Sequence, residues 1–383
     1  MRTFLNLLIV AFILPVFFSC DNAQTARMYV GGYTGRDSND GGLRIIDIDL
    51  KKSVFTLVSE ADAGPSPSYI CVSKKRGMVY AANEATVVVD GVRMGAVTAL
   101  KLDADGKNAN KVKEVYLQNG GPCYVSITPD EDFLLLAHYG SGAISVVSLD
   151  GNGLPLEVTD AIVFREEGIN SARGHMAIVG PNGKIYFTCL ALDKVMIFDL
   201  DKSMGKLTQT GYGMLPQGEG PRHFEFSKDG TKMFVINELG SSMTVFDVAN
   251  DGNVHEIQTI STLPEGWTGQ NSCADVHLSK DGKYLYGSNR GHNSIVTFKV
   301  MADGKLSFAG TTPCGGNHPR NFTLDPSGKY LIVANTNANP NPELYGPTPE
   351  NIALFAIDQN TGLPIAHGDI YITKQPSCLK FPE

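Results

Sequence analysis

The sequence predicts an all-β protein: a seven-bladed β-propeller of four-stranded antiparallel blades, whose ring is closed by the N- and C-terminal strands in one blade. Three observations support this prediction. The 383 residues include 41 Gly, and helix-period patterns are scarce, which indicates many turns and many strands. A hairpin pattern recurs along the chain at a nearly constant interval. The length left after a predicted N-terminal signal divides into seven units of propeller-blade size.

Composition excludes several classes of protein. With 32 Lys and Arg against 40 Asp and Glu, the net charge of −8 has the wrong sign for attraction to nucleic acid. The chain is 42% hydrophobic and only 19% charged, which argues against disorder. Only one long apolar run stands out, so a polytopic membrane protein is not expected. We therefore expect an acidic globular protein that does not bind nucleic acid.

The apolar run lies at the N-terminus and is predicted to be an export signal. Arg2 precedes residues 4–18, a run too short to span a bilayer comfortably. The run ends in Ser19-Cys20, which resembles a bacterial lipobox, although Phe17 stands where Leu is usual. We predict a signal peptide over residues 1–19 and a periplasmic or outer-envelope lipoprotein, attached to the membrane only through a lipid on Cys20. A plain signal peptide with an incidental Cys is the alternative.

Six other cysteines remain in the mature chain. An even number in an exported protein is compatible with disulfides, but most of these residues lie inside apolar strand patterns, which favours buried free thiols. Neither a CxxC motif nor a Cys/His metal spacing occurs, so we expect no metal ion and no other cofactor. The six are Cys71, Cys123, Cys189, Cys273, Cys314 and Cys378.

The repeat consists of a polar segment, a strand, a tight turn and a second strand. Asn-Gly, Asp-Gly and Ser-Gly pairs between alternating apolar runs are strong hairpin signals. A third strand follows each hairpin, as in Ser242–Val248, and further strand-like residues complete a four-strand unit. The turn residues are spaced 46 to 54 residues apart and fall at Gly77, Glu131, Gly183, Gly230, Gly282 and Gly328.

The seventh unit is split between the two ends of the chain. Residues 375–381 have the pattern of a first strand, and residues 28–34 have the pattern of the second strand of the same unit. Their pairing would close the ring without leaving a free edge. The 364 residues that follow the signal correspond to seven units of 52. Residues 21–383 are therefore predicted to form one domain, because two β-sandwiches would not produce a constant period.

Hairpin geometry places the candidate site at one mouth of the propeller. Arg222 and Glu238 are nearly equidistant from the Asp229-Gly230 turn, so they share the hairpin end away from it. Aligning the repeats on their turns gives two rings of residues at that end, rich in arginine and suited to an anionic small molecule. The first-strand ring is Ser68, Cys123, His175, Arg222, Ala274, Arg320 and Ser377. The second-strand ring is Glu84, Tyr139, Ala191, Glu238, Arg290, Thr336 and Thr34.

For the residues beside the rings we expect other roles. His223 follows Arg222 and should point to the opposite face of its strand, in a packing role. Asn237, Asn289 and Asn335 recur one position before the second ring, which indicates a shared structural role. The longer connections at this mouth, residues 337–350 and the loop at residues 89–94, are candidates for a partial lid.

Several motifs resemble the seven-bladed lactonase propeller family, which contains 6-phosphogluconolactonases and carboxymuconate cyclases. The likeness covers nearly the whole mature chain. The matching segments are residues 29–34 (YVGGYT), 220–223 (GPRH), 236–238 (INE), 288–292 (SNRGH) and 319–322 (PRNF). The family often shows His-x-His in the third blade, whereas this chain has Arg173-Gly174-His175.

The resemblance implies a catalytic set of His175, Arg222, Glu238 and Arg290. We expect Arg320, Asn289, Arg173 and His138 to contact the substrate. Lactone hydrolysis needs an activated water and stabilisation of a carbonyl oxyanion. Glu238 or His175 would be the base, and Arg222 and Arg290 would hold a phosphate or carboxylate.

Three functions remain open at this point. The leading one is a lactone hydrolase that resembles 6-phosphogluconolactonase and acts on an anionic or sugar-like lactone. The others are a carboxymuconate cyclase-like cycloisomerase and a non-catalytic binding propeller of the cell envelope. Export argues against the cytosolic pentose-phosphate role. The sequence does not separate these functions or indicate an oligomeric state.

The lipid anchor can be tested by itself. Substituting Cys20→Ala removes the acceptor thiol, so the protein should move from the membrane fraction to the soluble fraction. Fractionation followed by immunoblotting measures this shift. An unchanged distribution would contradict the lipoprotein prediction.

Overall fold

The computed structural model describes residues 25–34, 42–337 and 348–382. The predicted signal peptide and Cys20 lie outside the described residues, as does most of the long connection at residues 337–350. Among the residues that the structure describes, no helix has the length and apolar character needed to cross a membrane.

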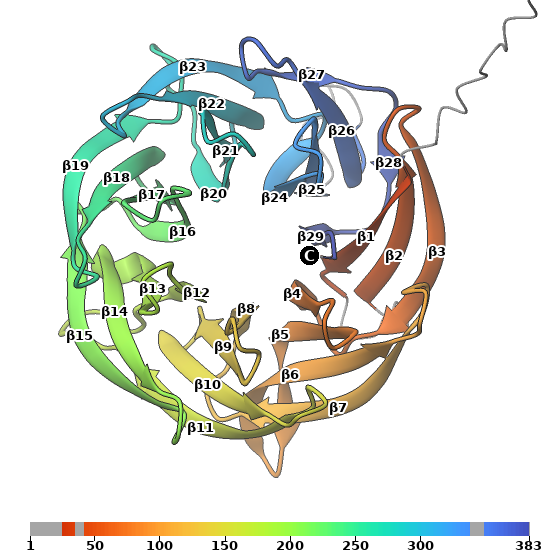
Figure 1. Ribbon diagram of the computed structural model, residues 1–383, viewed down its shortest axis with the longest axis vertical. Coiled ribbons are helices and arrows are strands. Elements are labelled where there is room, and N and C mark those ends of the chain that lie inside the picture. Colours follow the sequence, from red (N-terminus) through yellow and green to blue (C-terminus); the bar gives the residue numbers. More distant parts are fainter. Residues whose placement is uncertain (1–24, 35–41, 338–347, 383) are drawn as a thin grey trace, which may run out of the picture.

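Seven antiparallel sheets are arranged around a common axis (Figure 1). Six of the sheets in the described ranges have four strands each, and the remaining one has a fifth, short strand. In the first six blades the chain runs from the innermost strand outward. The predicted all-β, seven-bladed propeller is therefore confirmed.

The first three blades follow one another along the chain. The first contains β4 (Pro67–Ser73), β5 (Met78–Val89), β6 (Val92–Leu102) and β7 (Ala109–Leu117). The second contains β8 (Pro122–Ile127), β9 (Phe133–His138), β10 (Ala143–Leu149) and β11 (Pro155–Val163). The third contains β12 (Gly174–Val179), β13 (Ile185–Cys189), the short 3-10 helix η1 (Leu190–Leu192), β14 (Lys194–Asp201) and β15 (Lys206–Met214).

The next three blades continue this order. The fourth contains β16 (Pro221–Phe226), β17 (Lys232–Asn237), β18 (Ser242–Val248) and β19 (Val254–Ser261). The fifth contains β20 (Ser272–Leu278), β21 (Tyr284–Arg290), β22 (Ser294–Val300) and β23 (Leu306–Pro313). The sixth contains β24 (Asn317–Leu324), β25 (Tyr330–Asn337), β26 (Asn351–Ile357), β27 (Pro364–Ala366) and β28 (Tyr371–Ile372).

The two chain ends form the closing blade. Its order is β29 (Pro376–Lys380), β1 (Thr25–Gly32), β2 (Gly42–Asp49) and β3 (Val54–Asp62). Gly31 pairs with Cys378, as the split-repeat interpretation requires. A Cβ atom on Gly31 would lie 2.6 Å from the Pro67 carbonyl oxygen of the first blade. Glycine here therefore allows the closing blade to approach its neighbour.

The six predicted turn residues adopt the backbone conformation that a tight hairpin needs. All six have positive φ angles, including the non-glycine Glu131 at 63°. Each amide also donates to the carbonyl three residues earlier, as from Gly230 to Ser227. The turns that define the repeat in the sequence are therefore tight turns in the structure.

Buried tyrosines join neighbouring blades at four places. Tyr29, Tyr80, Tyr186 and Tyr286 all lie on second strands and are almost fully buried. Each hydroxyl donates to the carbonyl of a positive-φ glycine in the outer hairpin of the next blade, over 2.7 to 3.1 Å. The bond satisfies a phenol that would otherwise be buried without a partner.

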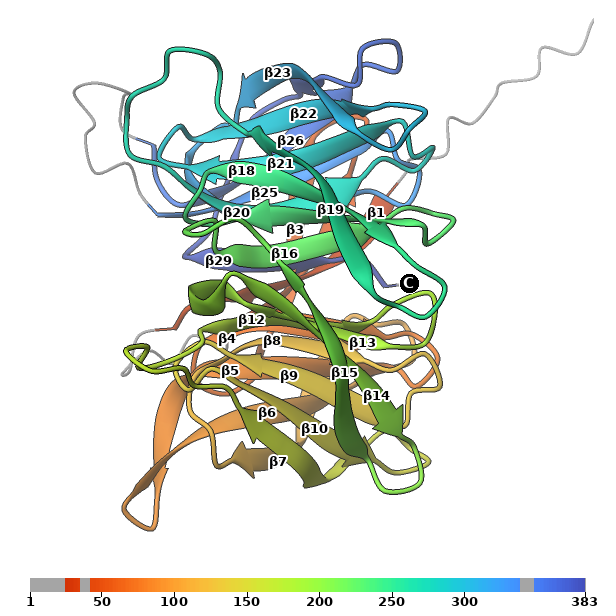
Figure 2. The same cartoon turned by 90° about the vertical axis from the view of Figure 1, so that its left-hand side faces the viewer.

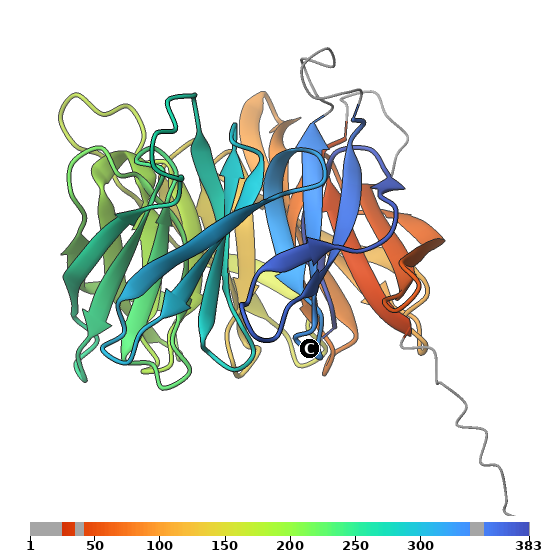
Figure 3. The ribbon, with the colours of Figure 1, turned by 90° about the horizontal axis from the view of Figure 1, so that it is seen from above.

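The predicted loop at residues 89–94 is instead the end of a β-hairpin. Strands β5 and β6 remain paired up to Val89 and Val92. The hairpin projects beyond the neighbouring blades in the side view (Figure 2). Viewed edge-on, the propeller is a disc, and this extension lies on the face opposite the C-terminus (Figure 3). Backbone pairing therefore continues where the sequence was interpreted as an enlarged loop.

Five cysteines are buried free thiols, as the sequence predicts: Cys123, Cys189, Cys273, Cys314 and Cys378. Cys71 is partly exposed. Burial raises the pKa of the Cys273 and Cys314 thiols to about 12, so both behave as small apolar residues.

Because β29 closes the ring, we expect that truncating a core side chain on this strand destabilises the protein. Leu379 on β29 is fully buried among Val30, Ile46 and Ile332. Leu379→Ala should lower the free energy of unfolding by about 2–5 kcal/mol, because it removes buried methyl groups and leaves a cavity. Leu57→Ala, on the exposed outer strand of the same blade, should cost less than about 0.5 kcal/mol. Urea denaturation of both variants measures the difference, and equal effects would contradict the closing role of β29.

Candidate active site

A shift in strand register occurs near the inner mouth of every blade. In six of the sheets, the pairing between the innermost strand and its neighbour slips at the end away from the hairpin turn. In the closing blade no turn joins β29 to β1, and their pairing slips between Gly31 and Gly32. A β-bulge leaves the extra residue unpaired and redirects its side chain. The residues at these slips include the whole predicted first-strand ring, Ser68, Cys123, His175, Arg222, Ala274, Arg320 and Ser377.

Residues from six blades enclose a cavity of about 250 Å³ at this mouth. Three of the four predicted catalytic residues, His175, Glu238 and Arg290, line it. Arg222 does not line the cavity, but its side chain contacts Glu238 from behind. The predicted convergence is therefore present in the structure. The full lining is Glu84, Cys123, Tyr139, His175, Glu238, Arg290 and Arg320.

Glu238 bridges two guanidinium groups. Its Oε2 atom accepts a hydrogen bond from Arg222 Nε at 2.9 Å and lies 3.0 Å from Arg290 Nη2. Burial alone would raise the pKa of Glu238, but the positive charges of Arg290 and Arg222 outweigh it and lower that pKa. Glu238 is therefore an ionised carboxylate held by two cations, which makes it a weak proton acceptor.

Arg222 and Arg290 are buried guanidiniums whose geometry is set by backbone carbonyls as well as by Glu238. Arg222, only 1% exposed, donates from Nη1 to the Ala274 carbonyl. Arg290 donates from Nη2 to the Cys273 carbonyl at 2.7 Å. Its Nε atom is buried and has no hydrogen-bond partner among the described residues. Burial, followed by the nearby charge of Arg222, lowers the pKa of Arg290 to about 10, which leaves it charged at neutral pH.

His175 contributes a neutral imidazole to the cavity. The residue is 3% exposed, and its Nδ1 atom has no hydrogen-bond partner within the described part of the chain. Its ring meets those of Tyr139 and His223 edge to face, with centroids 5.9 and 5.0 Å away. Burial, together with the positive charge of Arg222, holds the pKa of His175 well below 6.5. His175 is therefore a neutral ring, one of whose two nitrogens is unprotonated and able to accept a proton.

A second polar cluster occupies the other side of the cavity. Tyr33 donates a hydrogen bond to Glu84 at 2.8 Å, and Arg320 Nη2 lies 3.6 Å from the same carboxylate. The Arg320 guanidinium also stands 5.2 Å from the centre of the Tyr33 ring. The site as a whole has three guanidiniums, two carboxylates and a neutral histidine. Its net charge of about +1 suits an anionic ligand.

Tyr33 was missed because no turn joins β29 to β1. The hairpin alignment placed Thr34 in the ring, but Thr34 hydrogen-bonds Ser66 of the first blade. The register slip between Gly31 and Gly32 belongs to a strand pair formed by the two chain ends. The sequence therefore offers no turn from which to count, and its only signal here is the tyrosine in the YVGGYT segment.

Three predicted substrate-binding residues lie outside the cavity lining. Asn289 is buried and bonds the Thr262 carbonyl and Ser294. His138 is buried and its Nε2 atom lies 3.0 Å from Ser145 Oγ. Arg173 is exposed, with its guanidinium 5.7 Å from the ring centre of Tyr139. Arg320 is thus the one member of the predicted substrate-binding set that lines the cavity.

The prediction that His223 points away from Arg222 was wrong, although its ring does pack edge to face against Tyr69 and Tyr124. Its Nε2 atom lies 3.4 Å from Arg222 Nη1, so consecutive side chains turn toward each other instead of alternating. The reason is the register slip between Pro221 and His223, because strand alternation fails at a bulge. His223 is therefore part of the polar network behind the cavity.

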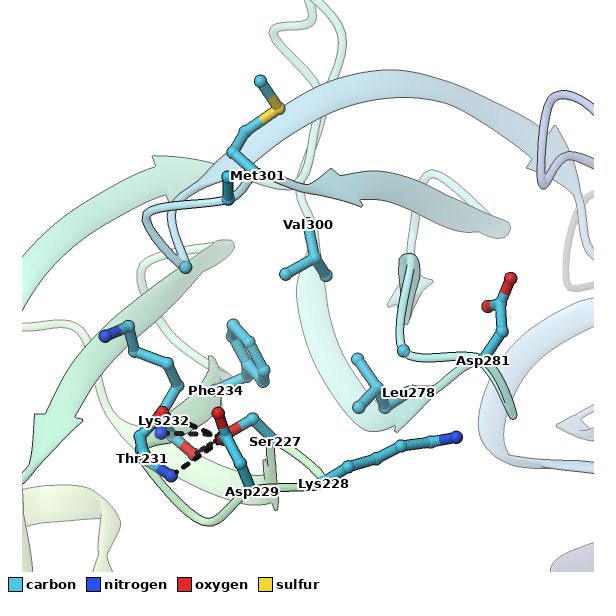
Figure 4. Close-up of a pocket in the computed structure, with 13 residues that line it drawn as sticks. Ser227, Lys228, Asp229, Thr231, Lys232, Phe234, Leu278, Asp281, Val300 and Met301 are labelled. Atoms are coloured by element: carbon cyan, nitrogen blue, oxygen red, sulfur yellow. Dashed lines mark hydrogen bonds between the residues drawn. The ribbon is translucent and has the colours of Figure 1, made fainter.

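A separate pocket of about 320 Å³ lies at the opposite end of two blades, between their hairpin turns (Figure 4). Its polar groups bond one another: Ser227 Oγ lies 2.6 Å from Asp229 and accepts from the Lys232 amide. These bonds stabilise the turn and leave no convergent set of free polar groups comparable with the cavity at the other mouth.

Comparison with known proteins agrees with this geometry. A family model described as "Lactonase, 7-bladed beta-propeller" matches residues 27–381. The chain belongs to the seven-bladed β-propeller lactonases. A 6-phosphogluconolactonase of Erwinia tasmaniensis is 30% identical, over 82% of this chain and 87% of that protein. The 6-phosphogluconolactonase of Bacillus subtilis is 27% identical, over 92% and 97%.

A solved structure of similar shape supports the same assignment. A Bacteroides fragilis protein provisionally described as a 6-phosphogluconolactonase is 29% identical to this lactonase, with a TM-score of 0.81. The alignment covers 95% of this chain and 99% of that protein. The likeness therefore extends over the entire propeller and is not confined to a few blades.

The ion pairs of Glu238 predict a pH-dependent contribution to stability. Because folding lowers the Glu238 pKa, the ionised carboxylate stabilises the folded state above its ordinary pKa of 4.5, and this contribution is lost as pH falls through the folded value. Glu238→Gln should lower the free energy of unfolding at pH 7 by about 3 kcal/mol, because it leaves buried guanidiniums without a counter-charge.

Urea denaturation of both proteins at several pH values tests this prediction. The stability difference should be constant from pH 6 to 8 and shrink below about pH 4.5. Glu256→Gln, on the exposed side of an outer strand, is the matched control and should change stability little. A difference that grows in acid would contradict an ionised Glu238.

Proposed function

We propose that this lactonase hydrolyses a small anionic or sugar-like lactone in the 250 Å³ cavity. The observation that carries the proposal is the meeting of His175, with its free Nδ1 atom, and the guanidiniums of Arg290 and Arg320 in one enclosed space. The names of the Erwinia and Bacillus relatives support a phosphorylated sugar lactone as one substrate class.

His175 is proposed as the general base. Its neutral imidazole takes a proton from water while the water oxygen attacks the lactone carbonyl carbon. The ring C–O bond then breaks, and the imidazolium returns the proton to the departing ring oxygen. The product is a hydroxy acid, which loses a proton to solvent as it ionises. His175 ends the cycle neutral, so no additional acid is required.

The arginines are proposed to bind and stabilise negative charge. Arg290 has an unpartnered buried Nε–H, which fits the oxyanion that develops on the lactone carbonyl. Arg320 lies across the cavity beside Glu84 and Tyr33, where it fits an anionic or hydroxylated part of the substrate. Glu238 keeps Arg222 and Arg290 in place, because its carboxylate is paired with both guanidiniums.

Hydrolysis of a panel of lactones by purified residues 21–383 tests the proposal. The panel contains 6-phosphogluconolactone, unphosphorylated gluconolactone and a carboxymuconolactone. His175→Gln should lower kcat/KM by about 10²–10⁴-fold, because it removes the proton acceptor. His255→Gln, at an exposed position of β19, is the matched control and should retain full activity.

The outcomes separate the alternatives. No turnover of any lactone would overturn the hydrolase proposal, and cyclisation of a carboxymuconate by the same protein would indicate a cycloisomerase. If His175→Gln is as active as His255→Gln, the base is wrongly placed. In the wild type, kcat/KM should be flat above pH 6.5 and fall only in more acidic solution, because the base must be unprotonated. An acid limb at or above pH 6.5 would contradict the assignment.

Export would place this activity outside the cytosol. The signal over residues 1–19 remains a prediction, and it favours a lactone present in the cell envelope over one formed in cytosolic metabolism. Activity in a membrane fraction that is released by Cys20→Ala would support both the enzyme and its location.

A further inference from the structure

A buried network lies behind Arg222, on the side away from the cavity. His223 Nδ1 is 2.7 Å from Asp275 Oδ1, and Asp275 Oδ2 is 3.2 Å from His277 Nε2. Asp275 Oδ2 also accepts hydrogen bonds from the Asn321 side-chain amide and from the Phe322 backbone amide. The three network residues, His223, Asp275 and His277, line a different cavity of about 840 Å³, which shares no lining residue with the 250 Å³ cavity.

The protonation states in this network follow from its contacts. Burial opposes ionisation, but His277 and His223 hold the pKa of Asp275 well below 3.8, so its oxygens only accept hydrogen bonds. In the hydrogen bond between His223 and Asp275, the proton must therefore be carried by His223 Nδ1. Burial and the charge of Arg222 lower the pKa of His223 to about 4, which leaves the ring neutral at pH 7. Its Nε2 atom then carries a lone pair that faces Arg222 Nη1 at 3.4 Å.

His277 supplies the counter-charge for Asp275. Burial disfavours the imidazolium, but Asp275 and Glu225 outweigh it and raise the pKa of His277 to about 10. Its Nδ1 atom lies 3.3 Å from Glu225 Oε2, near the other opening of the ring. The ion pair of Asp275 and His277 therefore lets a carboxylate remain charged at a position where its side chain is 3% exposed.

We propose that Asp275 is a positioning residue that acts on the active site through His223 and Arg222. By fixing His223 as the Nδ1–H tautomer, Asp275 makes Nε2 an acceptor for the Arg222 guanidinium. Arg222 is thereby held in the orientation in which its Nε–H donates to Glu238. The kinetic consequence rests on the proposed lactone hydrolysis, whereas the tautomer and the position of Arg222 do not.

An isosteric substitution should reverse this arrangement. In Asp275→Asn, the amide oxygen belongs at the Oδ2 position, where Asn321 and Phe322 donate. The new NH₂ group would then face His223 Nδ1, which must become an acceptor. His223 would then adopt the Nε2–H tautomer. Two hydrogen-bond donors, His223 Nε2 and Arg222 Nη1, would face each other. The repulsion would displace the guanidinium from Glu238.

Nitrogen NMR of histidine-labelled protein tests the tautomer directly. At pH 7 the wild type should show His223 as a neutral ring protonated at Nδ1, and Asp275→Asn should convert it to the Nε2–H form. His223→Gln identifies the signal by its loss. A wild-type His223 that is protonated at Nε2 or on both nitrogens would overturn the proposal, as would a tautomer unchanged in Asp275→Asn.

Two further measurements test positioning. The Arg222 Nε–H signal should be slow to exchange in the wild type and broadened or lost in Asp275→Asn. With a lactone substrate, kcat should fall about 10–100-fold in this variant while KM changes less than threefold, since Arg222 does not line the cavity. Asp369→Asn, at an exposed site, is the matched control and should leave both parameters unchanged.

The possible failures can be told apart. A reversed tautomer with unchanged Arg222 exchange and kcat would refute positioning, whereas a wild type inactive on every lactone would refute only the proposed function. If Asp275→Asn does not fold, His223→Phe keeps a ring of similar shape and removes both nitrogens. It should show the same loss of the Arg222 signal, and an intact signal would overturn the proposal.

Discussion

The slip in strand register at the inner mouth of every blade is the feature on which the site depends. A regular innermost strand would alternate its side chains between the two faces of its sheet. The bulge breaks this alternation at the ring position, so the side chains of Arg222 and His223 contact each other although the residues are adjacent in sequence. The same slip in the other blades brings Cys123, His175 and Arg320 to one cavity.

Charge balance explains how so many ionised groups can be buried together. Each buried guanidinium meets a carboxylate or a backbone carbonyl, as Arg222 does with Glu238 and Ala274. Behind Arg222, the negative charge of Asp275 is balanced by the positive charge of His277. Two buried polar atoms on residues that line the cavity, Arg290 Nε and His175 Nδ1, are left without partners among the described residues. Unpaired buried groups are costly, so their presence at this point favours a ligand that pairs with them.

Much of the architecture could be predicted from local patterns. Tight turns with glycine, or with a tolerated positive φ at Glu131, are local features that the sequence shows directly. Counting from those turns predicted the first-strand ring and the pairing of Arg222 with Glu238. The counting failed for Tyr33, because a strand pair formed by the two chain ends has no turn. Asn289 and His138, which the counting placed one position before the second ring, bond partners outside the cavity.

The sequence by itself determined the number of blades, the closure by both ends and which first-strand residues reach the mouth of the propeller. It did so because hairpin turns and strand periodicity are encoded within some twenty residues of one another. The tertiary structure decided which side chains share a cavity, the ionised state of Glu238 and the neutral state of His175. These properties depend on burial and on charges contributed by other blades. The distances between side chains of different blades cannot be predicted from the sequence pattern within one blade.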